Sequence, residues 1–488
     1  MSTRVHVEHV KGAVYPKWQQ ESCYGPSKRY PEFVNFRDMI LTEDNQVYEM
    51  VRNTLVALGL DSANIGTEEW NPFSEMIHCG DTVLVKPNMV HHKNGNEEEG
   101  TDCLVTHPSI VRVVLDYVVL ALKEGGKIIL ADAPVQSCDF SILVRELHYD
   151  KLVEYYAGRG ITVELMDLRQ LDEAYIKSID KSALFTAKNE DVVVRLGQDS
   201  AFCAREQIEE SVGNLRITNY LPARMAEYHN DTEHMYSVAR AVMEADVIIN
   251  LPKPKTHRKA GMTASLKNMV GCVAKKECLP HHTKGSKSEK GDEYLQSSVF
   301  KRWRTSLQEY KDKLTATEKK IPGYISFVER VLGRLQRMQS VDKYSEGSWY
   351  GNDTLWRTIC DLCRIVMYAD KKGVMTDEKQ RNMFILADMI VAGEGEGPLL
   401  PGAKPVGALV GGWEQIAVDK TIAALMGFDS DKFPSIKNAS FGERYVLPDS
   451  EVQISSNDGA LHGRTPEQIR VEADPFVPTS GWKEWLEN

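Results

Sequence analysis

Long hydrophobic runs are missing from this sequence. No stretch approaches the roughly 18 consecutive apolar residues that a membrane-spanning helix needs. The N-terminal segment, MSTRVHVEHVKGAVYPKWQQ, also lacks the continuous apolar core of a signal peptide. Both absences predict a cytoplasmic protein without membrane insertion.

An excess of positive charge is missing as well. Lys and Arg number 59 against 70 Asp and Glu, so the net charge at pH 7 is −11. Because a general nucleic-acid surface needs clustered positive charge, the composition argues against a nucleic-acid partner. The 42% hydrophobic and 26% charged residues are typical of an ordinary globular protein.

Paired cysteines are scarce. The nine cysteines are scattered and odd in number, which predicts free thiols in a reducing compartment. Only Cys360 and Cys363 form a CxxC pair, within TLWRTICDLCRIVMYAD. Apolar residues recur there at helical spacing, so we expect a packed helix rather than a zinc or redox site, which would need a second pair. Neither the phosphate loop GxxxxGK[ST] nor the dinucleotide motif GxGxxG is found at the candidate sites.

From Asp81 onward, short β-branched runs alternate with amphipathic helical stretches. This alternation predicts an α/β fold with a mainly parallel sheet flanked by helices. The longest predicted helix spans 107–123, with Thr106 as its cap and Gly125-Gly126 as its stop. A second helix is predicted over 150–158, and strands are predicted over 82–87, 127–133, 161–166, 246–252, 384–388 and 406–412.

Changes in composition divide the chain into five parts. The segment from 297 to 340 is charged with helical periodicity, and it lies in a stretch that interrupts the strand pattern. We therefore predict an N-terminal extension (1–80), a first part of the α/β core (81–278), a helical insertion (279–375), the completion of the core (376–435) and a wrapping C-terminal extension (436–488).

The densest group of chemically active residues lies in NLPKPKTHRKAGMTASLKNMVG, residues 250–271. A predicted strand ends at Leu251, and the loop after it precedes a helix expected to begin near Gly261. Loops at the carboxyl ends of parallel strands bind ligands, and cations there favour an anionic one. The alternative is a solvated basic loop. The candidate residues are Lys255, Thr256, His257, Lys267 and Asn268.

A second group follows the first predicted strand. Lys86 ends an apolar run, where a lysine is costly to bury unless an anion pairs with it. We therefore expect Lys86 to contact the ligand, together with Asn88, Thr106 and His107.

A third group is acidic. Glu394 and Glu396 alternate with three glycines beyond Asp388, where a strand is predicted to end. We expect a flexible loop whose carboxylates serve acid–base chemistry or a hard cation, with a solvated turn as the alternative. Asp419 falls among apolar residues of a predicted helix, and Asp132 ends a predicted strand. Each of these two carboxylates could be part of the functional site or a structural hydrogen-bond acceptor. The candidate metal ligands are Asp388 and Asp419.

These groups coincide with a resemblance to a known family. Five blocks of the sequence resemble successive blocks of the domain-of-unknown-function-362 family: 86–88, 100–108, 246–271, 393–398 and 417–429. The resemblance covers the chain from Asp81 to about Pro434. The family often has Asp-Gly-Ile where this chain has Asp388-Met389-Ile390. Many relatives carry a ferredoxin-like cysteine cluster. This chain has no CxxCxxC, so no iron–sulfur cluster is expected.

A more distant similarity involves the nickel-pincer lactate racemases. Their histidine is followed ten positions later by the lysine that holds the cofactor, and His257 and Lys267 have this spacing. The glycine pair before that lysine is replaced by Ser265-Leu266, so cofactor attachment is not inferred. The similarity implies a two-lobed α/β fold with a site in the cleft.

The leading functional expectation is an enzyme acting on a small anionic substrate, a carboxylate or a phosphorylated metabolite. His257 would be the acid–base group because its unperturbed pKa lies near neutrality. Lys86, Lys255 and Lys267 would hold the anion, and Glu394 and Glu396 would supply carboxylates. Racemisation is the most specific reaction class, by analogy alone. A divalent metal and an oligomer are both compatible with the sequence.

Two alternatives belong to other classes. A non-catalytic carrier of a metal or anion would need the basic pocket but not a titrating His257. A scaffold would act through the helices predicted between Ser297 and Ser340.

Overall fold

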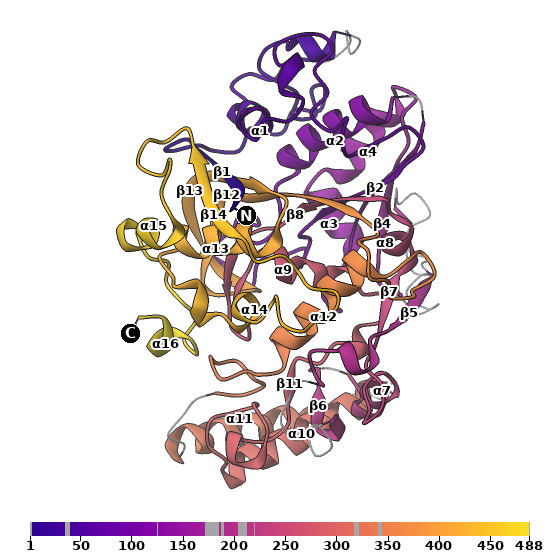
Figure 1. Cartoon of the computed structure of the whole chain (residues 1–488). Coiled ribbons are helices and arrows are strands. Elements are labelled where there is room, and N and C mark those ends of the chain that lie inside the picture. Colours follow the sequence, from indigo (N-terminus) through magenta and orange to yellow (C-terminus); the bar gives the residue numbers. More distant parts are fainter. Residues whose placement is uncertain are drawn as a thin grey trace.

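The fold is organised around one large mixed sheet (Figure 1). The computed structural model describes residues 2–487 except 35–39, 124, 171–184, 187–189, 204–211, 219, 317–321 and 340–343. The strand order is β14-β1-β13-β12-β8-β2-β3-β4. These strands are β1 (Ser2–His9), β2 (Thr82–Pro87), β3 (Lys127–Asp132), β4 (Val163–Asp167), β8 (Val247–Leu251), β12 (Asn382–Glu396), β13 (Leu400–Gly412) and β14 (Glu451–Ser456).

The sheet is mainly parallel, as predicted. β12, β8, β2, β3 and β4 pair parallel in that order. β13 is antiparallel to both of its neighbours, β12 and β1, and β14 lies parallel to β1 at the edge. The α/β fold class is therefore confirmed.

Helices cover both faces of the sheet because neighbouring strand residues point to opposite sides. Val83 and Val85 pack with one helical layer, and Leu84 between them packs with the other. The first layer holds α1 (Gln46–Ala57), α2 (Pro108–Leu122), α3 (Phe140–Glu146) and α4 (Tyr149–Ala157). The second holds α8 (Arg240–Glu244), α9 (Ser265–Asn268), α12 (Leu355–Tyr368), α13 (Gln415–Leu425), α14 (Pro434–Lys437) and α15 (Pro466–Glu472).

A smaller unit lies below the sheet in Figure 1 and gives the chain its two-lobed outline. Its helices are α7 (Pro222–Tyr228), α10 (Val299–Ala316) and α11 (Gly323–Gln339), next to the strand pair β6 (Leu215–Arg216) and β11 (His282–Thr283). A separate two-stranded sheet pairs β5 (Asp191–Arg195) with β7 (Met235–Ala239), and α16 (Lys483–Leu486) lies near the C-terminus. No described helix is long and apolar enough to cross a membrane.

The helix that contains the CxxC pair is confirmed. Cys360 and Cys363 lie in α12 with both side chains fully buried. Their thiols act as small core groups, because burial raises the pKa of Cys360 to about 12 and that of Cys363 well above its ordinary value.

The predicted cap of α2 was wrong. His107 is the N-cap, and its Nδ1 accepts a hydrogen bond from the backbone N–H of Ser109 at 3.2 Å. The Thr106 hydroxyl instead donates to the carbonyl of Leu251 at 2.6 Å and accepts from the backbone N–H of Asn88 at 2.9 Å. Thr106 therefore ties the end of β2 to the end of β8.

The prediction of a flexible loop for the acidic segment around Glu394 and Glu396 was wrong, because the segment is part of a strand. β12 continues to Glu396 and pairs with β13 in a hairpin, with a bulge between Met389 and Val391. The glycines serve close packing here: a Cβ on Gly393 would lie 2.7 Å from the Cβ of Lys255, and one on Gly397 would overlap the carbonyl of Thr256. Because these glycines have no side chain, the backbone of the β9 segment can lie very close to β12, and β12 continues past Asp388.

The helix predicted from Gly261 also begins later. Residues 255–263 form a hairpin of β9 (Lys255–His257) and β10 (Gly261–Thr263), and α9 starts only at Ser265. Gly261 has φ +79°, in the region that favours glycine, and it permits the tight turn. The hairpin brings its basic residues back over the carboxyl end of the sheet.

Candidate functional site

A cavity of about 450 Å³ lies where the parallel strands end. It is lined by residues that follow β2 and β3, by the β9–β10 hairpin and α9, and by the hairpin tip at Pro398 and Leu399. From β2 the chain builds β3 and β4 on one side and β8 and β12 on the other. Loops diverge at such a reversal of strand order and leave a crevice in which ligands of open α/β sheets bind.

The cavity is strongly basic. Seven of its lining residues carry a cationic or imidazole group, namely Lys255, His257, Arg258, Lys259, Lys267, Lys276 and His281. Asp132 is the carboxylate among the lining residues of the described chain. Apolar side chains such as Val90, Val270 and Leu279 complete the wall. A site with this balance favours an anion.

The single acidic group is already paired. The Lys86 ammonium lies 2.7 Å from Asp132 Oδ1, and both side chains are buried. Asp132 Oδ2 accepts the backbone N–H of Met89 at 2.6 Å. A Cβ on Gly271 would overlap this carboxylate, so a glycine is required there. Lys86 is thus the partner of Asp132 and not a lining residue, and it cancels the negative charge in the wall.

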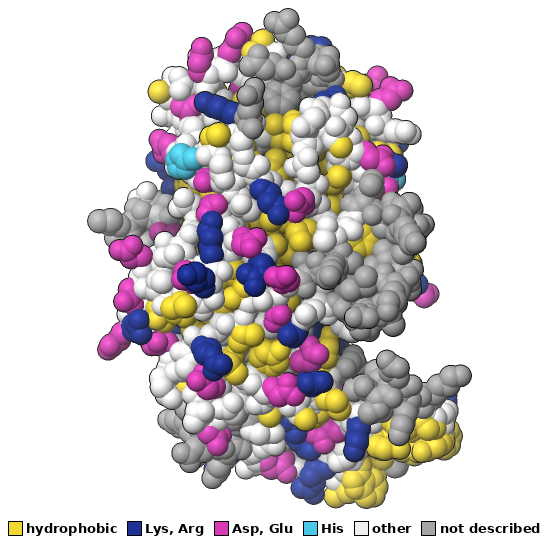
Figure 2. Space-filling model, turned by 90° about the vertical axis from the view of Figure 1, so that its right-hand side faces the viewer, with side chains coloured by type: hydrophobic (Ala, Val, Ile, Leu, Met, Phe, Trp, Pro, Cys, Tyr) yellow, Lys and Arg dark blue, Asp and Glu magenta, His cyan; other side chains and the backbone are white. Residues whose placement is uncertain are grey.

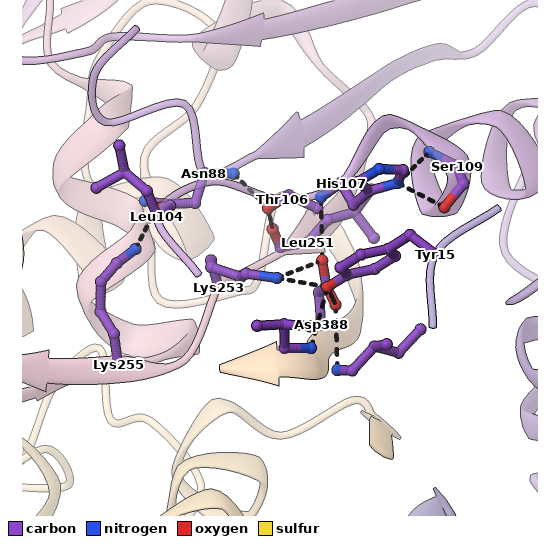
Figure 3. A network of polar contacts seen from close by, with 12 residues as sticks. Tyr15, Asn88, Leu104, Thr106, His107, Ser109, Leu251, Lys253, Lys255 and Asp388 are labelled. Atoms are coloured by element: carbon purple, nitrogen blue, oxygen red, sulfur yellow. Dashed lines mark hydrogen bonds and ion pairs between the residues drawn. The ribbon is translucent and has the colours of Figure 1, made fainter. Parts of the chain in front are cut away.

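Lys255 is held at the inner end of the cavity. Its Nζ donates to Asn88 Oδ1 at 2.8 Å and to the carbonyl of Leu104 at 2.7 Å (Figure 3). The Asn88 amide donates to Asn268 Oδ1 at 3.2 Å, which fixes both amides. Burial, with Lys253 and Lys267 nearby, lowers the pKa of Lys255 well below its ordinary value. An anion beside it would offset this cost.

Three further lysines in the cavity wall have lowered pKa values. Burial lowers the pKa values of Lys259, Lys267 and Lys276 to about 8, and the charges of Lys276 and Lys259 add to the effect on Lys267. The Lys276 Nζ donates to the carbonyl of Ala133 at 2.9 Å. Lys267 is partly exposed and makes no hydrogen bond or ion pair with any residue of the described chain. Its amine is therefore available to a ligand.

The two cavity histidines have opposite tautomers. Nδ1 of His257 accepts the backbone N–H groups of Lys259 and Ala260, both at 3.1 Å, so its proton lies on Nε2. Nδ1 of His281 lies 2.8 Å from the carbonyl of Leu279 and must donate to it, which leaves Nε2 as an acceptor. Burial and nearby cations lower the pKa of His257 well below its ordinary value and that of His281 to about 3. Both imidazoles are neutral at pH 7.

The structure brings five of the candidate site residues into the cavity wall: Asn88, Lys255, His257, Lys267 and Asn268. Thr256 faces β12 instead, and its hydroxyl donates to the carbonyl of Gly395 at 2.8 Å. Lys86 lies behind Asp132, and Thr106 joins two strands. These three residues support the wall without lining it.

Asp388 and His107 belong to a buried network next to the site (Figure 3). The Asp388 carboxylate accepts hydrogen bonds from the hydroxyl of Tyr15 at 2.6 Å, from Lys253 Nζ at 2.9 Å and from the backbone N–H of His107 at 3.0 Å. The rings of Tyr15 and His107 stack 4.0 Å apart. The network joins the N-terminal extension, α2 and β12.

Asp419, the other predicted metal ligand, serves the start of α9. Its carboxylate accepts the backbone N–H and the hydroxyl of Ser265, at 2.7 and 2.6 Å, and the backbone N–H of Leu266 at 3.2 Å. Burial raises its pKa to about 7. Because α9 carries Lys267 and Asn268, Asp419 acts as a positioning residue for them. Within the described ranges, no three His, Cys, Asp or Glu side chains are placed together to hold a metal ion.

Glu394 and Glu396 hold the C-terminal segment. Glu394 Oε2 accepts the backbone N–H of Val477 at 2.9 Å, and Glu396 Oε1 accepts that of Ser480 at 2.8 Å. Neither carboxylate is among the cavity-lining side chains that the structure describes. Nearby, the indole of Trp482 donates to the carbonyl of Arg258 at 2.9 Å. The tail therefore braces the β9–β10 hairpin from outside.

Sequence reasoning missed several lining residues. Lys276, His281, Thr218 and Tyr220 come from segments without a strand-end motif, and they reach the cavity only through the fold of the chain after β6 and α9. Asp132 did carry a signal, since it is the last residue of a buried strand.

Comparisons with known proteins place these features in a family context. The model of a family described as "Domain of unknown function (DUF362)" matches residues 83–198 and 185–424, well over half of the chain. The thylakoid-associated protein sll1697 of Synechocystis sp. is 32% identical over 85 residues, which cover 16% of this chain and 26% of that protein. The chain thus matches about a quarter of that relative's length. No solved structure matches the chain.

Proposed function

The chain belongs to the DUF362 family, and we propose that it is an enzyme that binds a small anionic metabolite in the basic cavity and moves a proton on it. The substrate class is a carboxylate or a phosphorylated metabolite. One observation carries the proposal: the Lys267 amine, whose pKa is lowered to about 8, lies in the cavity wall and makes no hydrogen bond or ion pair with any described residue.

Binding follows from the lysines. Lys255 and Lys276 are fixed by hydrogen bonds to the chain, and the cost of burying their charges falls when an anion enters. At the same end of the cavity, the Asn88 amide uses one N–H for Asn268 Oδ1 and keeps the other for a ligand, whereas the Asn268 amide donates to the carbonyl of Lys86 and to Asn250 Oδ1 and so helps to hold Asn88 in place. A ligand with a carboxylate or phosphate can therefore replace water there with several charge-assisted hydrogen bonds.

Lys267 is the proposed base. A lysine whose pKa is about 8 keeps a neutral fraction near pH 7. Its neutral amine takes a proton from the carbon next to the substrate carboxylate, and the electrons of the broken C–H bond move onto the carboxylate oxygens. The Nε2–H of His257 then hydrogen-bonds the oxygen on which charge develops, as a neutral imidazole can.

Return of the proton completes the reaction. The Lys267 ammonium gives the proton back to the other face of the carbon or to a neighbouring position, which yields an isomer and regenerates the amine. Atoms and electrons balance without an external oxidant or reductant. The proposed reaction class is therefore isomerisation or epimerisation of a small acid.

A second candidate is a non-catalytic anion-binding protein. The lysines and the fixed donor of His257 would serve such a protein equally well. What favours chemistry is the Lys267 amine, which has no hydrogen-bond or ion-pair partner among the residues that the structure describes.

Solvent exchange separates the two candidates. The protein is incubated in deuterated water with small hydroxy acids and sugar phosphates, and loss of the C–H signal is followed by proton NMR. The enzyme account predicts exchange that falls by about a hundredfold or more in Lys267→Met and His257→Gln. Anions that bind in the cavity without any exchange in the wild type would favour the binding protein.

We also propose a cytoplasmic location. All nine cysteines are free, and seven of them are buried. Buried free thiols suit a reducing compartment. Fractionation of cells that express the protein tests this point.

A further inference from the structure

Helix α11 has an apolar stripe that is exposed in the part of the chain that the structure describes. Ile325 and Leu332 are buried. A second stripe, with the spacing i, i+3, i+4 and i+7, lies on another side of the helix and is exposed. It consists of Tyr324, Phe327, Val328 and Val331, of which Tyr324 is 63% and Phe327 is 61% exposed.

Helix α10 carries a matching stripe. Val299, Trp303 and Tyr310 are spaced by four and seven residues, which places them along one side of the helix. All three are exposed, Trp303 by 56%. The space-filling view shows hydrophobic side chains gathered on the lower unit, which contains both helices (Figure 2).

The net charge of the segment 297–340, which contains α10 and α11, is opposite in sign to that of the rest of the chain. Residues 297–340 contain ten Lys and Arg against four Asp and Glu, a net charge of +6, whereas the remainder carries −17. Arg302, Lys313, Arg330 and Arg334 are exposed on the same two helices as the apolar stripes. Apolar and aromatic stripes flanked by basic residues are typical of helices that lie in a membrane interface.

We propose that α10 and α11 form a peripheral binding surface for a membrane that contains anionic lipids. The aromatic side chains would enter the headgroup region, and the basic residues would contact the lipid phosphates. A second copy of the chain fits less well, because it would set one basic unit against another. The inference is independent of the reaction proposed for the cavity.

Flotation with lipid vesicles tests the proposal on the full chain. The wild type should float with vesicles of phosphatidylcholine that contain about one third phosphatidylglycerol, and much less with phosphatidylcholine alone. Trp303→Ser/Phe327→Ser should weaken vesicle binding by about tenfold or more, because each exposed aromatic ring supplies buried apolar area in the bound state. Raised salt should weaken binding as well.

A matched control removes exposed apolar groups elsewhere. Val374 and Val471 are 60% and 72% exposed and lie outside 297–340. Val374→Ser/Val471→Ser should float like the wild type, and both double variants should keep the melting temperature of the wild type because the replaced side chains face solvent. The proposal is overturned if the wild type does not float with anionic vesicles or if both double variants float equally. It is also overturned if Trp303→Ser/Phe327→Ser instead converts a dimer to a monomer or abolishes binding to an acidic protein.

Discussion

His257 and His281 enter the same cavity with their protons on opposite ring nitrogens. Nδ1 of His257 is a hydrogen-bond acceptor from two backbone N–H groups, whereas Nδ1 of His281 donates to a backbone carbonyl. The two imidazoles that line the cavity therefore have opposite roles at Nε2, a donor in His257 and an acceptor in His281. A ligand that carries both an anionic oxygen and a hydroxyl group would match them.

This arrangement predicts two distinct tautomers by NMR. In ¹⁵N-edited spectra at about pH 7, His257 should carry its proton on Nε2 and His281 on Nδ1. Because burial holds both pKa values below the ordinary 6.5, neither ring should become cationic on acidification to about pH 5. An imidazolium signal from either residue at pH 6 would contradict the assignment.

The lowered lysine pKa values predict that anion binding depends on pH. A bound anion raises the pKa values of Lys259 and Lys276 from about 8, so binding takes up protons near pH 8. Affinity for sulfate, which stays a dianion over this range, should be highest below about pH 7 and fall as the pH rises through 8 and above. Titration calorimetry in buffers of different ionisation enthalpy measures the proton uptake. An affinity that is flat between pH 7 and pH 9 would refute it.

The buried pair of Lys86 and Asp132 predicts a large loss of stability when it is broken. Asp132→Asn should lower the free energy of unfolding by about 3–5 kcal/mol, because the Lys86 ammonium loses its partner in the interior. The exposed pair of Lys127 and Glu164 is a control, and Glu164→Gln should cost about 1 kcal/mol or less. Denaturant titration measures both. If both variants lost the same free energy of unfolding, burial of the ion pair would not be the cause of the loss in Asp132→Asn.

The position of Glu394 and Glu396 predicts a structural effect in place of a catalytic one. Glu394→Gln/Glu396→Gln should speed amide hydrogen exchange at Val477 and Ser480 by about tenfold, because weaker acceptors hold these N–H groups. Phosphate affinity should stay within about twofold of the wild type. Abolished anion binding or turnover, with unchanged exchange at the tail, would instead support the catalytic role expected from the sequence.

The sheet was predictable because its signals are local. Continuous apolar, β-branched runs such as 82–87 are typical of strands in a sheet covered on both faces, and β2 has these bounds. The strand-end rule also placed Asn88 and Lys255 at the carboxyl ends of β2 and β8, where the structure has them. Local patterns sufficed wherever a residue's place depends on its own strand or helix.

The sequence-based predictions were wrong or incomplete where contacts between distant parts of the chain determine the position of a residue. Glycines between Asp388 and Pro398 suggested a loop, but they admit the close approach of Lys255 and Thr256 to a continuing strand. The acidic side chains there are used by a tail about 80 residues further along the chain. Likewise, nothing near Lys276 or His281 in the sequence indicates that the fold brings them to the ends of β2 and β3.

The central claim is that Lys267 faces an anion in the cavity. Titration calorimetry of inorganic phosphate near pH 7 compares the wild type with Lys267→Met, and with Lys372→Met as a control at an exposed lysine. We predict that Lys267→Met weakens phosphate binding by about tenfold or more while Lys372→Met leaves it unchanged. Equal affinities of all three proteins for phosphate would contradict the assignment of the cavity as the functional site.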